Sequence, residues 1–335
     1  MFNQGLIHVS RCQGDRQDLT DSFVMEIRKL EDRGGEVMVS KYYDGIHFPP
    51  DVPGDIKDHL EAVMNMAHKE GDILLYSFPK TGKNIDIYIC VPCVPFAGTH
   101  WTWEVLHMLQ CGKADYTHGK IIALDFDPIE KFEALESPRI ILSHMFPKHL
   151  PKFVKDEKCK ILYIYRNPKD TAVSMNLFFK RLQVKDFEGY DGKWEHFFEM
   201  FAYGKLYYND WFEHVESWLE FKRKNPDIPI LIMAYEDMKR DLRSCVQKIA
   251  EHFGTKQDPE FLDQVADKCQ FSAMSKAKTA DEIETAMSKD GSNPFYRKGE
   301  VGDWKNWFTV AQNEMFDKVL EEKMADIDLK LEYTL

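Results

Sequence analysis

The sequence has no long hydrophobic run, because no stretch reaches the roughly 18 apolar residues that a membrane-spanning helix needs. It also has no excess of positive charge: 44 Lys and Arg residues against 56 Asp and Glu residues give a net charge of −12. These two features argue against a membrane partner and against nonspecific binding to nucleic acid. An anionic ligand would have to be held by a few cations that the fold brings together.

Cysteine is scarce and follows no framework spacing. The seven cysteines are an odd number, which is typical of a reducing compartment, and so we expect a cytoplasmic protein. Cys90 and Cys93 have the spacing of a redox pair or of half a zinc site, but no second Cys/His pair completes it, and we expect no metal. Linkers, repeats and low-complexity segments are also missing. This predicts one domain over residues 39–335, preceded by an extension, residues 1–38, of unknown function.

The sequence does contain an alternation of strand and helix patterns. Short apolar, β-rich runs predict strands at 72–78, 139–143, 160–165 and 229–234, and helical apolar spacing predicts helices at 99–110, 168–182, 206–224, 238–253 and 309–324, with a further helical patch around 22–30. Such alternation favours an α/β fold, a single domain whose central parallel sheet is flanked by helices. Ligands bind these sheets at the carboxyl ends of the strands, which is where Lys80, His144 and Arg166 fall.

A phrase suited to phosphate binding is split between two places. Pro79-Lys80-Thr81-Gly82 closes the first predicted strand, and Thr99-His100-Trp101 opens the following helix. Joined, the halves would form a strand, a tight loop and a helix N-terminus, where backbone N–H groups and the helix dipole favour an anion. Lys80 adds a point charge, and the threonines add hydroxyl donors. Sixteen residues, 83–98, separate the two halves.

The joined phrase resembles the 5′-phosphosulfate-binding loop of the cytosolic sulfotransferases, and four further phrases follow in family order between about residues 40 and 335. They are Ser143-His144 after an apolar strand, Tyr163-Ile-Tyr-Arg166 with the helix after it, Tyr235-Glu-Asp-Met238, and Arg297-Lys298-Gly299 leading to Trp304-Lys305. The resemblance implies a P-loop-like sulfotransferase fold. It also implies transfer of a sulfonate group from 3′-phosphoadenylyl sulfate (PAPS) to a hydroxyl of a small acceptor such as a phenol, steroid or alcohol. The product nucleotide would be 3′-phosphoadenosine 5′-phosphate (PAP).

The resemblance also implies roles for individual residues. His144 would be the general base, since imidazole titrates near neutral pH; His149 is a local competitor, and a structural histidine is the ordinary alternative for either. Lys80 would stabilise charge on the sulfonate and the leaving phosphate, Trp101 and Phe271 would contact adenine, and Arg166 with Ser174 would hold the 3′-phosphate. The implied donor-binding set is Lys80, Thr81, Gly82, Thr99, His100, Trp101, Arg166, Ser174, Tyr208, Phe271, Arg297, Lys298 and Gly299.

A second resemblance concerns assembly. Lys305, Thr309, Val310 and Glu314 resemble the short dimerisation motif of the family, which implies a homodimer. An ordinary solvated helix start is the alternative interpretation of the same residues.

The segment 83–98 leaves the activity itself open. Gly82-Lys83 and Phe96-Ala97-Gly98 can be encoded by a splice donor and a splice acceptor in the same phase, so we hypothesise a retained intron or alternative splicing. The alternative function is a catalytically impaired nucleotide-binding or dimeric interaction protein, in which the segment disrupts the loop. A P-loop kinase is disfavoured, because Ser77 and Asn84 stand where a Walker motif needs Gly and Ser or Thr.

Overall fold

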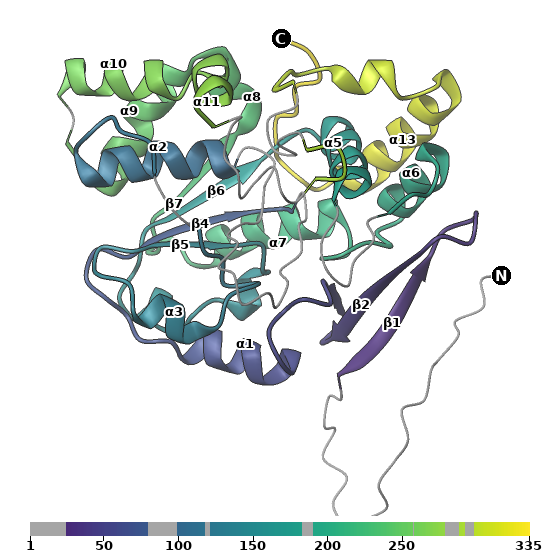
Figure 1. Cartoon of the computed structure of the whole chain (residues 1–335), viewed down its shortest axis with the longest axis horizontal. Coiled ribbons are helices and arrows are strands. Elements are labelled where there is room, and N and C mark those ends of the chain that lie inside the picture. Colours follow the sequence, from purple (N-terminus) through teal and green to yellow (C-terminus); the bar gives the residue numbers. More distant parts are fainter. Residues whose placement is uncertain are drawn as a thin grey trace, which may run out of the picture.

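A parallel sheet forms the centre of the computed structural model, which describes residues 25–79, 99–117, 121–182, 190–256, 258–278, 288–291 and 298–335 (Figure 1). The strands are β4 (Ile73–Ser77), β5 (Ile140–Ser143), β6 (Ile161–Tyr165) and β7 (Ile230–Ala234), and they pair in the order β5-β4-β6-β7. Each of the predicted strands is confirmed to within one residue at either end. Apolar runs of this length form buried parallel strands because helices cover both of their faces.

The two faces of the sheet are packed against different sets of helices. Along β4, Leu74 and Tyr76 point into one core, while Ile73 and Leu75 point into the other, as the period of two along a strand requires. The first core packs against α1 (Ile56–Asn65), α5 (Pro168–Arg181), α6 (Trp194–Ala202), α7 (Trp211–Lys224) and α13 (Val310–Lys323). The second packs against α2 (Thr99–Cys111), α8 (Tyr235–Arg240), α9 (Leu242–Phe253), α10 (Pro259–Lys268) and α11 (Phe271–Lys278). The predicted α/β fold with a flanked parallel sheet is confirmed.

Short elements complete the connections between the strands and the longer helices. They are α3 (Ile129–Glu133), α4 (Phe153–Asp156) and the 3-10 turns η1 (Pro147–His149) and η2 (Asp303–Asn306).

A small antiparallel sheet lies beside the main body (Figure 1). It consists of β1 (Glu26–Glu31), β2 (Val37–Tyr43) and β3 (Ile46–Phe48), paired in that order. The helical patch expected around 22–30 is therefore wrong for residues 26–30, because they pair with β2 and expose alternate side chains. The expected start of the main domain at residue 39 falls inside β2.

Two predicted helices have different limits from those expected. The helix predicted over 206–224 begins at Trp211, because Tyr208 and Asn209 have φ values of 58° and 57°, in the left-handed region that helices exclude. The helix predicted over 238–253 is two helices, α8 and α9, which meet at Asp241. The Asp241 carboxylate caps α9 by accepting a hydrogen bond of 3.0 Å from the Ser244 amide. The helices predicted at 99–110, 168–182 and 309–324 are confirmed.

The C-terminal segment is tied to the central strand layer. The hydroxyl group of Tyr165, on β6, donates to the carbonyl oxygen of Lys330 at 3.1 Å. The indole nitrogen of Trp304 donates to the carbonyl oxygen of Tyr333 at 3.1 Å. Lys169, on α5, places its ammonium group 4.5 Å from the ring centre of Trp304 and 5.1 Å from that of Tyr333.

Within the described parts of the chain, no helix is long and apolar enough to cross a membrane.

Candidate active site

His144 directly follows β5, and its side chain is completely buried. Its Nδ1 atom lies 2.7 Å from the carbonyl oxygen of Ser77, at the end of β4. Because a carbonyl oxygen can only accept a hydrogen bond, Nδ1 carries the proton and Nε2 carries the lone pair. Burial also lowers the pKa of His144 well below its usual range. The imidazole is therefore neutral and has the tautomer that a general base acting through Nε2 requires.

Asp125 fixes the backbone of this histidine. Its two carboxylate oxygens accept the His144 amide N–H at 3.0 and 3.2 Å, and one of them accepts the Tyr208 hydroxyl at 2.7 Å. Burial raises the pKa of Asp125 to about 6, although these hydrogen bonds oppose the rise. The Tyr208 ring lies edge-on to the His144 ring, with centroids 5.8 Å apart. Asp125 therefore joins Tyr208 to the residue predicted to act as the base.

A second hydrogen-bonded chain holds the carbonyl group of His144. His214, on α7, donates from Nε2 to this carbonyl oxygen at 2.8 Å, and its Nδ1 accepts from the Tyr163 hydroxyl at 2.9 Å. Burial lowers the pKa of His214 to about 3 and raises that of Tyr163, so both groups are neutral near pH 7. We call Ser77, Asp125, His144, Tyr208 and His214 the His144 cluster. In this cluster the predicted base is held through its ring, its amide and its carbonyl.

The two halves of the split phrase meet at this cluster. The Ser77 hydroxyl, at the end of β4, lies 2.8 Å from the Thr99 hydroxyl, at the start of α2. The helix predicted to open at Thr99 does so, and both hydroxyl-bearing residues are buried. His100 is also buried in the first turn of α2. Lys80, Thr81, Gly82 and the segment 83–98 lie outside the described residues, so their predicted roles stay predictions.

Residues from four other chain segments, most of them aromatic or basic, form a closed series of contacts beside α2. The Arg166 guanidinium group lies 4.5 Å from the ring centre of Tyr235, and the Tyr235 and Trp101 rings meet edge to face at 5.5 Å. The Lys239 ammonium group lies 5.8 Å from the Trp101 ring centre and 5.4 Å from that of Phe271. We call Trp101, Arg166, Tyr235, Phe271 and Gly299 the Trp101 cluster.

Gly299 and Arg166 close this series. Gly299 has a φ of 62°, and a Cβ atom built on it would lie 2.4 Å from the Phe271 ring. Any other residue at this position would be strained in its backbone and would clash with the aromatic ring. Arg166 Nη2 donates to the carbonyl oxygen of the next residue, Glu300, at 2.8 Å, and it lies 3.6 Å from the Asp170 carboxylate. The Trp101 cluster thus brings together four residues that the sequence predicted, and it adds Tyr235.

Arg166 retains hydrogen-bonding capacity. Its side chain is buried, yet its Nε atom has no hydrogen-bond partner among the residues that the structure describes. Buried donors are normally satisfied, and guanidinium groups bind phosphate through paired N–H donors. Burial of this donor beside Tyr235 fits a site that receives an anion. Ser174, on the helix that follows Arg166, is buried as well.

The remaining predicted residues have mixed environments. Lys298 pairs with Asp303 at 2.7 Å, and 43% of its side chain is exposed. Arg297 lies outside the described residues. His149, the competitor of His144, is buried, and its Nε2 lies 3.6 Å from the Asp44 carboxylate. Burial and the neighbouring Lys148 lower the pKa of His149 to about 4, which an attractive interaction with Asp44 opposes.

Sequence reasoning missed several members of the two clusters. Tyr235 belongs to the phrase Tyr235-Glu-Asp-Met238, in which the sequence alone does not distinguish the side chain that faces a ligand. Asp125 is a charged residue inside the apolar stretch Ile121–Phe126, and that isolation was a signal for a buried functional carboxylate. His214 gave no local signal, because its partners are 51 and 70 residues away along the chain.

The predicted dimerisation residues lie at the start of α13. Thr309 caps the helix in a reciprocal arrangement with Gln312. Val310 follows it and is 77% exposed, which is unusual for an apolar side chain among the described residues. The pattern therefore has a clear structural role in capping, and it also presents an apolar residue at the surface.

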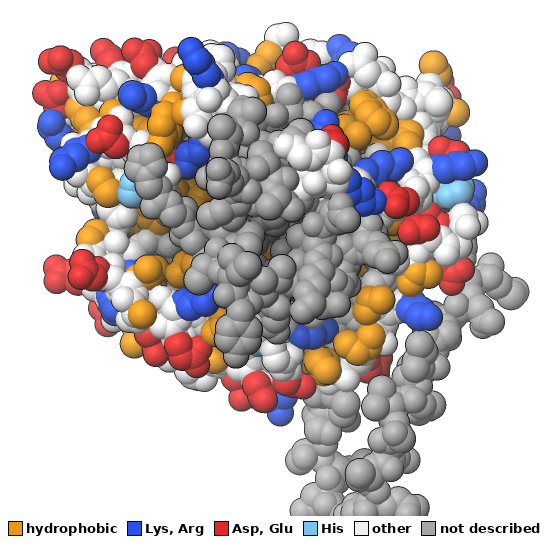
Figure 2. All heavy atoms as spheres, viewed as in Figure 1, with side chains coloured by type: hydrophobic (Ala, Val, Ile, Leu, Met, Phe, Trp, Pro, Cys, Tyr) orange, Lys and Arg blue, Asp and Glu red, His pale blue; other side chains and the backbone are white. Residues whose placement is uncertain are grey.

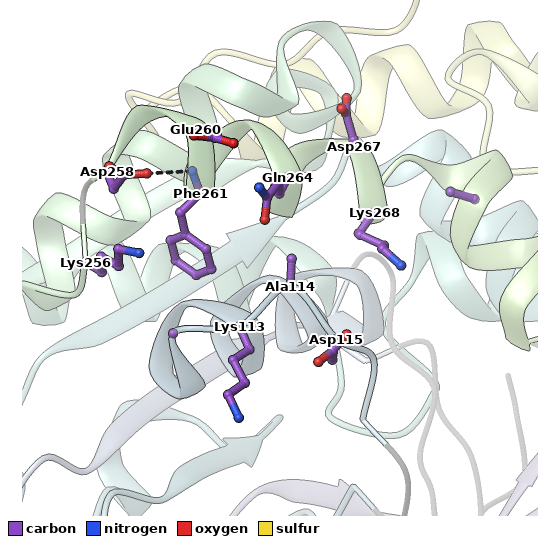
Figure 3. Close-up of a pocket in the computed structure, with 12 residues that line it drawn as sticks. Lys113, Ala114, Asp115, Lys256, Asp258, Glu260, Phe261, Gln264, Asp267 and Lys268 are labelled. Carbon is purple, nitrogen blue, oxygen red and sulfur yellow. Dashed lines mark hydrogen bonds between the residues drawn. The ribbon is translucent and has the colours of Figure 1, made fainter.

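Away from both clusters, the described residues form a surface of mixed charge. Acidic and basic side chains are interspersed among the described residues visible in Figure 2. A hollow of about 820 Å³ lies between the C-terminal end of α2 and α10 (Figure 3), and its lining includes Lys113, Phe261 and Gln264 but no predicted site residue. Among the described residues, no group of three or more His, Cys, Asp or Glu side chains is placed to hold a metal ion.

Comparison with known proteins gives the family. Residues 70–328 match the model of the sulfotransferase domain. Sulfotransferase 1B1 of Canis lupus familiaris is 32% identical over 296 residues, which cover 82% of this chain and 97% of the relative. Sulfotransferase 1C2 of Homo sapiens is 35% identical over 258 residues, which cover 72% of this chain and 84% of the relative. The chain therefore belongs to the sulfotransferase family.

Solved structures show the same fold. Mouse sulfotransferase SULT7A1, solved in complex with PAP, matches with a TM-score of 0.65 and 32% identity over 85% of this chain and 94% of its own. Retinol dehydratase, solved with androsterone and PAP, matches with a TM-score of 0.70 over 88% of this chain and 91% of its own. At 20% identity it supports the fold alone.

Proposed function

We propose that this protein transfers the sulfonate group of PAPS to a hydroxyl group of a small acceptor such as a phenol, steroid or alcohol. The observation that carries the proposal is the neutral, oriented imidazole of His144 at a strand end, linked through Ser77 to the hydroxyl of Thr99 at the start of α2. This is a base beside a helix N-terminus that suits an anion. Mouse SULT7A1, a relative of similar fold, was solved with PAP.

The Trp101 cluster fits the nucleotide part of PAPS. The buried Nε of Arg166 supplies an N–H donor for the 3′-phosphate, and Gly299 lets the backbone pack directly against Phe271. Trp101 and Phe271 supply flat apolar faces for the purine. Ser174, Arg297, Lys298 and Gly299 would assist Arg166. We propose that Tyr235 contacts the nucleotide. The same role for Tyr208 stays a prediction, because its hydroxyl is bonded to Asp125.

The proposed reaction balances with the residues of this chain. The acceptor oxygen forms a bond to sulfur, while the bond from sulfur to the bridging phosphate oxygen breaks and its electron pair leaves with PAP. The acceptor proton moves to Nε2 of His144. Lys80 would offset the charge on the leaving phosphate, and Thr81, Gly82, Thr99 and His100 would hold its oxygens. No metal ion is needed for any of these steps.

Assembly and location belong to the same proposal. We propose a homodimer through Lys305, Thr309, Val310 and Glu314, because the 77% exposed Val310 offers an apolar contact. Sedimentation of the wild type and of the Val310→Glu variant tests this, and equal masses would contradict it.

We also propose a cytoplasmic location, to which the free thiols of Cys111, Cys159, Cys245 and Cys269 are suited.

An acceptor screen tests the function. The purified chain is incubated with PAPS and panels of phenols, steroids and alcohols, and both PAP and the sulfated acceptor are measured. Formation of the two products in equal amounts is the expected result. PAP binding without turnover on any acceptor would instead favour the catalytically impaired binding protein. Failure to bind PAP, with binding of ATP in its place, would overturn the proposal.

A further inference from the structure

Glu104 is a fully buried carboxylate on α2, one turn after Trp101. Its Oε1 atom lies 2.5 Å from the Nζ atom of Lys278, and its Oε2 accepts the Thr117 amide at 3.1 Å and the Thr117 hydroxyl at 3.4 Å. The Lys278 ammonium group also donates to the Thr117 carbonyl oxygen at 3.0 Å. A buried charge is tolerated only when it is paired and hydrogen-bonded in this way.

Lys278 is the last residue of α11, the short helix that begins at Phe271. The other end of this helix is tied to α2 as well, because the Trp101 indole nitrogen donates to the Cys269 carbonyl oxygen at 2.5 Å. Residues three apart on a helix share one face. One face of α2, through Trp101 and Glu104, therefore holds both ends of the segment that carries Phe271. Figure 1 shows α11 with α10 on the α2 side of the sheet.

We propose that the Glu104–Lys278 ion pair positions Phe271 relative to Trp101 and so sets the width of the site for the adenine base of the donor. This inference rests on the proposed function, since it assigns Trp101 and Phe271 to the base. The Lys239 ammonium group lies within 6 Å of the centres of both rings, so the two rings border the same cation. Glu104 and Lys278 are positioning residues that act through α11, without contact to the base itself.

The geometry separates this role from simple stabilisation. If the pair only stabilised the fold, its loss would lower the melting temperature and leave the nucleotide affinity of the folded molecules unchanged. If it positions Phe271, its loss weakens PAP binding and raises the KM for PAPS, while the KM for the acceptor changes little. The acceptor would meet the His144 cluster, whose hydrogen bonds join the ends of β4 and β5 to Asp125, Tyr208 and α7, whereas Glu104 and Lys278 lie on α2 and α11.

The chain offers a matched control in a second buried ion pair. The side chains of Arg139 and Asp72 are both fully buried and lie 2.5 Å apart. They precede β5 and β4, and so they lie at the amino ends of the strands, whereas the clusters lie at the carboxyl ends. The variants are Lys278→Met, the milder Lys278→Gln, the conservative Lys278→Arg, and Arg139→Met as the control. Titration calorimetry with PAP and steady-state kinetics are measured at a temperature where each variant is folded.

The expected result is a loss of PAP affinity of about tenfold in Lys278→Met and Lys278→Gln, which corresponds to about 1.4 kcal/mol of binding free energy. Lys278→Arg should recover most of that affinity. Arg139→Met should lower the melting temperature and leave PAP affinity unchanged. Unchanged PAP affinity in the Lys278 variants, or an equal loss in Arg139→Met, would overturn the inference.

A second measurement keeps the inference separate from the proposed function. Hydrogen exchange of the nucleotide-free protein should be faster at residues 271–278 in Lys278→Gln than in the wild type, and unchanged there in Arg139→Met. Faster exchange without PAP binding by the wild type would mean that the pair holds α11 but that the nucleotide assignment is wrong. Unchanged exchange at 271–278 would overturn the positioning role itself.

Discussion

The Nδ1 atom of His144 donates a hydrogen bond to the carbonyl oxygen of Ser77, 2.7 Å away. This single contact selects the tautomer and turns Nε2 into the atom with the lone pair. It also links the end of β5 to the end of β4, from which the Ser77 hydroxyl reaches Thr99 on α2. Ser77 therefore holds the predicted base through its carbonyl group and the predicted anion-binding helix through its hydroxyl group.

Replacing His144 by alanine should lower kcat by about 10²- to 10⁴-fold, the usual effect of removing a general base. PAP affinity should stay close to that of the wild type, because the base acts on the acceptor. Initial rates and calorimetric titration measure the two effects. His149→Ala is the control and should keep most of the activity. If His144→Ala retains more than about a tenth of the wild-type rate, the base lies elsewhere.

Arg166→Ala should weaken PAP binding by about ten- to a hundredfold, since a charge-assisted hydrogen bond contributes roughly 1.5–3 kcal/mol. The variant also loses the contact with the Glu300 carbonyl group, so a second nucleotide is needed to separate the effects. Affinity for adenosine 5′-phosphosulfate, which has no 3′-phosphate, should fall much less. Equal losses for the two nucleotides would show that Arg166 is structural.

Tyr208→Phe should lower kcat without changing PAP affinity. The change removes the hydroxyl that donates to Asp125, and an unsatisfied buried acceptor costs roughly 1–3 kcal/mol. The effect should reach His144 through its amide, which Asp125 also binds. Tyr235→Phe provides the comparison for PAP affinity, because the Tyr235 ring lies in the Trp101 cluster, which we propose binds the nucleotide. A tenfold or greater loss of PAP affinity in Tyr208→Phe would instead support the nucleotide contact that the sequence predicted.

Stability toward urea should rise between about pH 4 and pH 6.5. Burial lowers the pKa from the usual 6.5 to about 4 for His47 and His149 and to about 3 for His214. In this range the unfolded chain binds protons at these residues and the folded chain does not, so acid favours unfolding. Asp125, with its pKa raised to about 6, and Glu236, whose pKa burial also raises, act in the opposite direction but are two groups against three. A urea midpoint that is equal or higher at pH 5 than at pH 7 would contradict this prediction.

Deleting residues 83–98, so that Gly82 meets Thr99, should raise activity and tighten PAP binding. Ser77 and Thr99 are already in contact, so residues 78–82 are sufficient to connect them. The connection between Ser77 and Thr99 shortens from 21 to five residues, and the lower entropy of loop closure contributes about 1 kcal/mol to stability. A melting temperature higher by a few degrees is expected. A variant that binds PAP no better and turns over no faster would show that the segment is an adapted part of this protein.

The transcript provides an independent test of the splicing hypothesis. Sequencing of cDNA across the codons for Gly82 and Thr99 should find a form that lacks the 48 nucleotides of the segment. A dominant cDNA that retains them would remove the hypothesis of a retained intron.

The parts of the fold that could be predicted are those with a local signal. The buried parallel strands were visible as apolar runs, and His144 and Arg166 stand directly after two of them. The hairpin β1–β2 was missed because Glu26–Glu31 is a charged edge strand whose pairing with β2, and not its composition, makes it a strand. Asp125, Tyr235 and the ion pair Glu104–Lys278 depend on tertiary contacts between distant segments, and spacing along one sequence does not reveal those contacts.

The tie between Tyr165 and Lys330 bears on how the protein matures during synthesis. Chains fold from the N-terminus as they leave the ribosome, and β6 is made when only half of the protein exists. The carbonyl group that accepts the hydrogen bond of the Tyr165 hydroxyl is synthesised 165 residues later. The carbonyl partner of the Trp304 indole, on Tyr333, is also made after Trp304 itself. When β6 has left the ribosome, the C-terminal residues that contact it next to Arg166 have not yet been made. Nucleotide binding should therefore be among the last properties that the growing polypeptide acquires.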